Sequence, residues 1–369
     1  MTPEGGSSSS VLGTLALVGI AIVGLSIVDA YLARTERQEN RAEAERLGEA
    51  GRGMVENGRP LEAVSDFKAA LAIERDNPDS WLALGQAQLA AGELEGAEAT
   101  LTELLRRDST AGAANLSLAR VLVKEGRVTE AVSTYHRAIY GHWERDAEAN
   151  RVRVRFELVN LLAEQGSKEE LLAELLPLLD VAPEDVEVRK HLGRLFLIAG
   201  SATRAGEIFR EILRNHPEDA DAYAGLGESE FARGNYQTAR ADFQAAANLR
   251  PSDAEISRRL ELSNDVLALD PMRRGISPTE QYQRSMWMVH LAKSAILQCS
   301  TALTKLEQDA IDEAQKAETK RVPSAQMSKA LEENLNLAEQ LWKIRLQECK
   351  RATTAAEEPL RLVLGKIAQ

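Results

Sequence analysis

The sequence predicts an all-α protein with an N-terminal transmembrane helix, an α-solenoid of about six repeats and a C-terminal helical hairpin. Aromatic residues form only 4 % and hydrophobic residues 44 % of the 369 residues. The hydrophobic content is mostly Ala, Leu and Val, which suits helices packed on helices better than β-sheets. Glycine recurs with a fixed period through the middle of the chain, and an uncharged apolar run lies near its start.

The first predicted element is a membrane anchor. A polar tail occupies residues 1–10, and the run from Val11 to Val28 carries no charge. A helix of this length rises about 27 Å, close to the thickness of the bilayer hydrocarbon. A cleaved signal peptide would need a positively charged start, which the tail lacks, and a buried core helix would need cover on all sides. We therefore expect a retained single-pass anchor at residues 11–32, followed by a charged linker at 33–43.

The charges around this span predict its orientation. The short segment before it contains no Lys or Arg, whereas arginines follow it at positions 34, 37, 41 and 46. By the positive-inside rule, the large C-terminal part should face the cytoplasm.

A periodic set of glycines predicts the solenoid. Glycines at positions 58, 92, 126, 166, 200 and 234 are spaced by 34, 34, 40, 34 and 34 residues, and a second set stands at 51, 85, 193 and 227. A fixed period of this size marks stacked supersecondary units. We expect the first set at the turns between paired helices, where glycine adopts a left-handed backbone at little cost. The second set, with Gly85 as an example, should let the paired helices approach closely.

The repeat resembles the tetratricopeptide repeat. The residues that match it are Trp81, Leu84, Gly85, Gly92 and Ala97, and, most fully, Tyr223, Leu226, Gly227, Gly234, Ala239, Phe243, Ala246 and Pro251. The resemblance implies six repeats, at residues 44–77, 78–111, 112–145, 152–185, 186–219 and 220–253. A final helix, 254–269, should cap a solenoid that spans residues 44–269. The fourth repeat departs from the pattern, with an insertion before it and Pro177 in its second helix, so we expect a wider or kinked unit.

The C-terminal helical region, residues 270–369, carries no repeat. Ser277, Pro278 and Glu280 predict a helix start, and the pattern predicts one helix to about residue 320, a turn at 321–324 and a second helix to about residue 352. Two such helices should form an antiparallel hairpin. Cys299 and Cys349 would then approach each other across it, and in the cytoplasm both should remain free thiols.

No motif in the sequence predicts catalysis. The five histidines lack metal-ligand spacing, and no phosphate-binding loop, dinucleotide-binding motif or nucleophile elbow is present. The net charge of −12 opposes binding to nucleic acid. We expect a protein that is not an enzyme, needs no cofactor and does not bind nucleic acid.

The resemblance also implies a peptide-binding groove lined by the first helix of each repeat. Carried over by repeat register, its candidate residues are Leu82, Gln86, Leu89, Leu116, Arg120, Val123, Lys124, Arg153, Phe156, Asn160, Lys190, Arg194, Leu197, Glu228 and Phe231. The middle of this set is basic and partly apolar, which suits an acidic, partly hydrophobic peptide or a chain-terminal carboxylate. Alternatively, these cations are solvated and paired with neighbouring glutamates.

The function expected from these features is that of a membrane-anchored scaffold or adaptor. Its repeats would hold a partner peptide or protein near the inner face of a bacterial cytoplasmic membrane. Two alternatives remain open: a periplasmic envelope-assembly factor, and a non-catalytic regulatory subunit of a membrane enzyme complex.

Overall fold

The computed structural model describes the backbone of residues 8–299, 303–349 and 351–367, and the side chains of these ranges from residue 25 onward. Within them the chain forms seventeen α-helices, one short 3-10 helix and a single isolated β-bridge. The contacts divide the chain into two compact units, residues 1–158 and 159–369. The boundary falls inside α7 (Ala147–Gln165), in the repeat where the sequence pattern is least regular.

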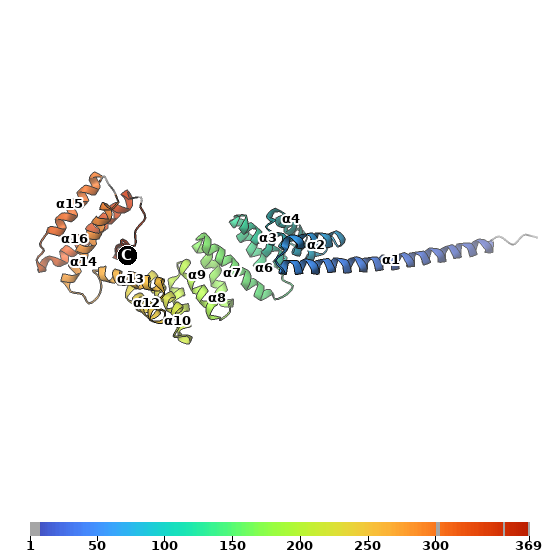
Figure 1. Ribbon diagram of the computed structural model, residues 1–369, viewed down its shortest axis with the longest axis horizontal. Helices are drawn as coiled ribbons and strands as arrows, with labels where there is room; N and C mark the ends of the chain where they lie inside the picture. Colours follow the sequence, from blue (N-terminus) through green and yellow to red (C-terminus); the bar gives the residue numbers. More distant parts are fainter. Residues whose placement is uncertain (1–7, 300–302, 350, 368–369) are drawn as a thin grey trace, which may run out of the picture. The chain divides into compact units, whose positions relative to one another are not determined.

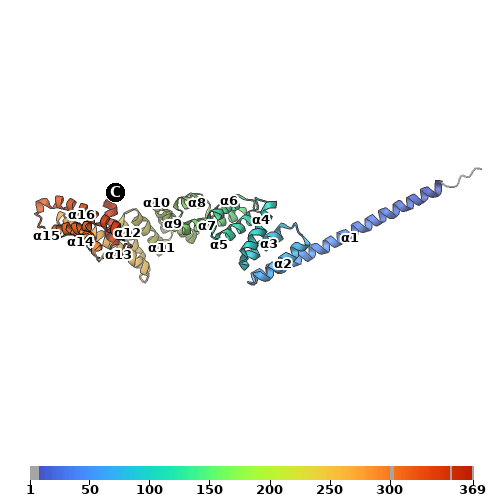
Figure 2. The ribbon, with the colours of Figure 1, turned by 90° about the horizontal axis from the view of Figure 1, so that it is seen from above.

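The first helix, α1 (Ser8–Glu56), is much longer than the others and contains the expected linker at 33–43 as helix. Its last turns pack against α2 (Pro60–Ile73), whereas its first part extends away from the packed helices (Figures 1 and 2). The predicted membrane span, residues 11–32, lies outside the residues with described side chains, except for its last eight residues. Among the residues that are described, no helix is long and apolar enough to cross a membrane.

Helix pairs follow the predicted period. They are α3 (Pro78–Ala91) with α4 (Leu94–Arg107), α5 (Gly112–Lys124) with α6 (Val128–Tyr140), α7 with α8 (Lys168–Val181), α9 (Val186–Ile198) with α10 (Ala202–Asn215), and α11 (Ala220–Ala232) with α12 (Tyr236–Leu249). All six periodic glycines have positive φ, between 71° and 81°. Only glycine adopts this backbone without steric cost, so the turn prediction is confirmed.

The second set of glycines is also explained by packing. A Cβ on Gly85 would lie 2.6 Å from Cδ2 of Leu101, a side chain of the paired helix that is fully buried. Gly51, Gly193 and Gly227 stand in the same relation to the phenylalanine sixteen residues later in each repeat. Glycine is therefore needed at these positions because a Cβ would occupy the space of one large side chain. This is a more specific reason than the expected close approach of two helix backbones.

The C-terminal region differs from the expected antiparallel hairpin. The first expected helix is two helices, α14 (Pro278–Leu297) and α15 (Lys305–Thr319), followed by the short 3-10 helix Ser324–Gln326 and by α16 (Met327–Glu348). Thr304 and Glu307 form a capping box that begins α15, a start signal inside the expected long helix. Because the chain reverses twice, α16 runs parallel to α14: Asn334 Nδ2 donates to Ser285 Oγ at 3.0 Å. The hairpin prediction is wrong.

Cys299 and Cys349 form a disulfide, with their Cα atoms 5.8 Å apart. The prediction of free thiols is therefore wrong, although the two residues do meet. They meet because parallel helices bring their C-terminal ends together, and each cysteine stands at or just after the end of its helix.

The helix expected to cap the solenoid, α13 (Ala254–Leu269), is itself covered. Its Val266 and Leu269 share one buried core with Met288 of α14 and Leu360 of α17 (Glu358–Ile367). Lys366 of α17 also pairs at 2.9 Å with the carboxylate of Asp270, which is almost fully buried. The end of the repeat array is thus sealed by the C-terminal helices, and α13 is an internal element.

Candidate functional site

A concavity of about 630 Å³ lies in the first unit, over α3, α5 and the start of α7. It is lined by Gln86, Leu89, Ala90, Ala113, Leu116, Ser117, Arg120, Val123, Lys124, Tyr135, Trp143 and Arg153. Seven of these were predicted as groove residues: Gln86, Leu89, Leu116, Arg120, Val123, Lys124 and Arg153. The structure thus brings together two of the three predicted residues of repeat two, all four of repeat three and the first of repeat four.

One wall of the concavity comes from the loop between α6 and α7, residues 141–146, at the end of the third predicted repeat. Backbone hydrogen bonds attach this loop to the preceding inter-repeat turn, from His142 N to Thr110 O at 2.7 Å and from Gly112 N to His142 O at 2.8 Å. Trp143 is half-buried, and its indole Nε1 donates to Ala138 O at 2.8 Å. The groove prediction missed Trp143, because it carried over only positions on the first helix of each repeat, and Trp143 lies in the loop after a second helix. An aromatic residue next to the one break in the period was the available signal.

Arg120 projects from α5 and is clamped by a carboxylate of α7. Its Nε and Nη2 donate to the two oxygens of Glu157 at 2.9 and 2.5 Å, and Tyr135 OH contacts the same carboxylate at 3.4 Å. The bond to Glu157 raises the pKa of Arg120 above its ordinary value. Burial, followed by the charge of Glu157, raises the pKa of Tyr135. Arg120 is therefore oriented by the protein, with its charge already partly neutralised.

Lys124 and Arg153 have a different environment. Both are exposed, and neither forms an ion pair or side-chain hydrogen bond with any residue that the structure describes. A partner carboxylate could bind either one without displacing an internal salt bridge. They are the cations of the concavity that are available to a ligand.

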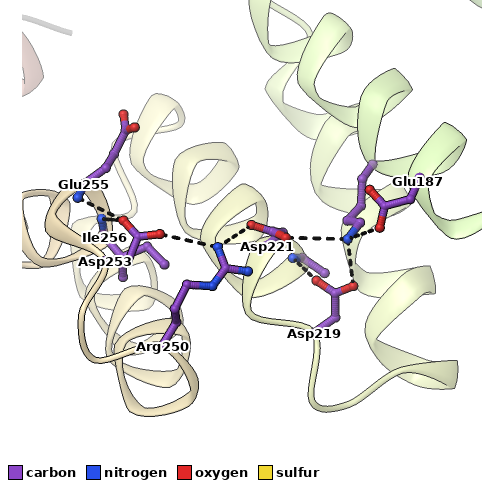
Figure 3. Close-up of polar contacts among 9 residues, drawn as sticks. Glu187, Asp219, Asp221, Arg250, Asp253, Glu255 and Ile256 are labelled. Carbon is purple, nitrogen blue, oxygen red and sulfur yellow. Dashed lines mark hydrogen bonds and ion pairs between the residues drawn. The ribbon is translucent and has the colours of Figure 1, made fainter.

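In the second unit, by contrast, the predicted groove cation Lys190 is already paired with carboxylates of the protein. Its side chain is 6 % exposed, and its ammonium group lies 2.6 Å from Glu187, 3.1 Å from Asp219 and 3.6 Å from Asp221. Figure 3 shows the contacts continuing from Asp221 to Arg250. Burial alone would lower the pKa of Lys190, but the carboxylates outweigh it and raise the pKa. Lys190 is a structural cation and is not available to a ligand.

Three other predicted residues of the second unit, Asn160, Glu228 and Phe231, also contact neighbouring side chains. Asn160 Oδ1 lies 2.8 Å from His191 Nε2. Arg259 of α13 pairs with Glu228 and places its guanidinium carbon 4.3 Å from the ring centroid of Phe231, which is buried. Arg194 is exposed and Leu197 half-buried; in the first unit, Leu82 and Phe156 are half-buried and do not line the concavity.

Family models described as tetratricopeptide repeat match residues 54–112, 89–150, 156–219 and 207–254, which together cover more than half of the chain. Among curated proteins, the chain is similar to human DnaJ homolog subfamily C member 3, with 21 % identity over 56 % of this chain and 43 % of that protein. It is also similar to the peroxisomal targeting signal receptor of Pichia angusta, with 29 % identity over 49 % of this chain and 32 % of the receptor. The chain thus spans less than half the length of these relatives.

Solved structures with a similar fold include YrrB, described as a TPR protein with an unusual peptide-binding site, at 20 % identity and a TM-score of 0.44. It matches over 53 % of this chain and 97 % of its own. The C-terminal part of a TPR repeat-containing protein from Cytophaga hutchinsonii matches at 14 % identity and a TM-score of 0.47, over 64 % of this chain and 92 % of its own. From the family models and the helix-pair architecture, this chain belongs to the tetratricopeptide-repeat family.

Proposed function

We propose that this protein is a non-catalytic, membrane-anchored scaffold that binds an acidic, partly apolar segment of a partner protein in the concavity of residues 86–153. The main support is the placement of Lys124 and Arg153. Two exposed cations without internal partners flank an apolar floor that contains Leu89 and Leu116. Unpaired cations beside apolar side chains are suited to a peptide that carries both features.

Charge reversal at these two positions tests the proposal. The variant Lys124→Glu/Arg153→Glu should lose partner binding with little change in thermal stability, because exposed charges contribute little to folding. Lys68→Glu/Arg75→Glu is the matched control, since it reverses two exposed cations of the same unit that lie outside the concavity. Binding can be measured by crosslinking from a photoreactive residue at position 90, which lines the concavity. Equal crosslinking by both variants would refute the proposal.

Exposed apolar side chains between residues 25 and 32 of α1 support the membrane anchor. The side chains of Leu25, Ile27, Val28, Tyr31 and Leu32 are 54–71 % exposed, so no part of the described protein covers them. We expect deletion of residues 1–33 to release a folded helical protein from membranes, since the turns of α1 that pack on α2 remain. A truncated protein that stays in the membrane fraction would contradict the anchor.

A second candidate function, an envelope-assembly factor with its repeats in the periplasm, is favoured by the disulfide. Disulfides persist in oxidising compartments and are rare in the cytoplasm, whereas the arginines after the span favour a cytoplasmic location. Thiol alkylation of intact cells under a denaturing quench decides between these sides. Quantitative protection of Cys299 and Cys349 until reductant is added would establish the oxidising side, and full alkylation would establish the cytoplasmic side.

A further inference from the structure

The loop between α6 and α7 places the indole of Trp143 against Gly112, the first residue of α5. A Cβ on Gly112 would lie 2.4 Å from the indole Nε1 and Cε2 of Trp143. Any other residue at position 112 would push the indole away. Because His142 is hydrogen-bonded to Thr110 and Gly112 and the indole donates to Ala138 O, the ring is held in place before a ligand arrives, which reduces the entropy lost on binding.

The concavity has an apolar end and a cationic end. Trp143 lies against Gly112 at the start of α5, and Lys124 closes the same helix. The helix rises about 18 Å between these two residues. An extended peptide advances about 3.3 Å per residue, so about five or six residues span that length. Arg120, clamped by Glu157, lies between the two ends and one helical turn before Lys124.

We infer that Trp143 determines the specificity of the concavity, by receiving a bulky apolar side chain of a partner segment whose carboxylates lie against Arg153 and Lys124. This inference rests on the proposed function and adds a requirement for one large apolar residue within about six residues of the acidic group. Two sources can supply the carboxylate, an Asp or Glu side chain or the end of a chain. Both have the same chemistry toward an unpaired cation.

Labelled six-residue peptides test the inference on the full-length protein in detergent. One probe carries phenylalanine at its first position and glutamates at its last two, separated by glycine and serine. In a second, serine replaces the phenylalanine, and in a third, glutamines replace the glutamates. Each is made with a free and with an amidated C-terminus, which separates chain-end from side-chain recognition. We expect the phenylalanine probe to bind about tenfold more tightly than the serine probe, as measured by fluorescence anisotropy.

Trp143→Ala should abolish that tenfold preference and leave the affinity for the serine probe unchanged. Trp287→Ala is the matched control, because this exposed tryptophan lies on α14 in the other unit. If circular dichroism shows that Trp143→Ala has lost helix, Trp143→Leu and Trp143→Gln replace it. The apolar variant should keep the preference and the polar one should lose it.

The outcomes separate this inference from the proposed function. If Lys124→Gln/Arg153→Gln weakens the glutamate probes but Trp143 variants keep the preference, the inference is overturned and the proposed function stands. If no probe binds the wild-type protein, both are overturned. If the preference follows Trp143 and the glutamates follow the two cations, both are supported.

Discussion

Replacement of Gly85 by alanine is a quantitative test of how the repeats pack. In an open helix, Gly→Ala stabilises by about 1 kcal/mol. Here the added Cβ would lie 2.6 and 2.7 Å from two carbons of Leu101, where ordinary contacts are about 3.5–4.0 Å. Leu101 is fully buried, and overpacking a core costs about 1–3 kcal/mol. We expect Gly85→Ala to destabilise the first unit by up to about 2 kcal/mol.

The matched control is Gly53→Ala, in α1, where an added Cβ meets nothing within 4 Å. It should stabilise the protein by up to about 1 kcal/mol. Urea denaturation followed by circular dichroism measures both variants. In a Leu101→Ala background, where the clash is gone, Gly85→Ala should become neutral or stabilising. The same sign at both sites, or the same effect of Gly85→Ala in both backgrounds, would refute the packing explanation.

The disulfide and a buried carboxylate give two further predictions. Cys299→Ala should lower the free energy of unfolding of the C-terminal helices by about 4 kcal/mol, because the bond to Cys349 closes a loop with a sequence separation of 50. Equal urea midpoints for the wild-type protein with and without reductant would contradict this prediction. Burial, followed by the charge of Glu230, raises the pKa of Asp242 to about 6, and its Oδ2 is buried without a hydrogen-bond partner among the described residues. The folded state therefore binds the Asp242 proton more tightly than the unfolded state, and the resulting stability is lost as the pH rises from about 4 through 6. Asp242→Asn should remove this loss, worth at most about 3 kcal/mol, and be more stable than wild type at pH 7.5. The control is Asp265→Asn, which changes an exposed carboxylate. If the free energy of unfolding of wild type and Asp242→Asn depends on pH in the same way, the raised pKa of Asp242 is refuted.

The repeat architecture could be predicted from sequence because its signals are local and repeated. A left-handed turn after each first helix requires glycine, and the same requirement recurs with each repeat, as at Gly92 and Gly234. The C-terminal helices offered no such repetition. There, a single capping box at Thr304 determines whether one helix or two will form. A prediction that overlooks this capping box gives α16 the opposite direction relative to α14.

The candidate site was only partly predictable, for a related reason. Repeat register places residues on the first helices, and it correctly grouped Leu89, Val123 and Arg153 around one concavity. It does not place Trp143, which lies in the loop after a second helix, where the groove register has no position. It also treats a cation in every repeat alike, whereas the availability of a cation depends on a carboxylate about thirty residues away in the chain.

Lys190 and Lys124 illustrate that dependence. Lys190 lies in the second turn of α9, where it reaches Asp219, the residue that caps α11 by accepting from Ala222 N at 2.8 Å. The N-cap aspartate of α11 thus neutralises a lysine near the start of α9, the first helix of the previous repeat. Lys124 instead ends α5, far from the N-terminal caps and at the negative end of the helix dipole, where a cation is favoured. A lysine at this end of a first helix is stabilised without a carboxylate partner, so its charge remains available to a ligand.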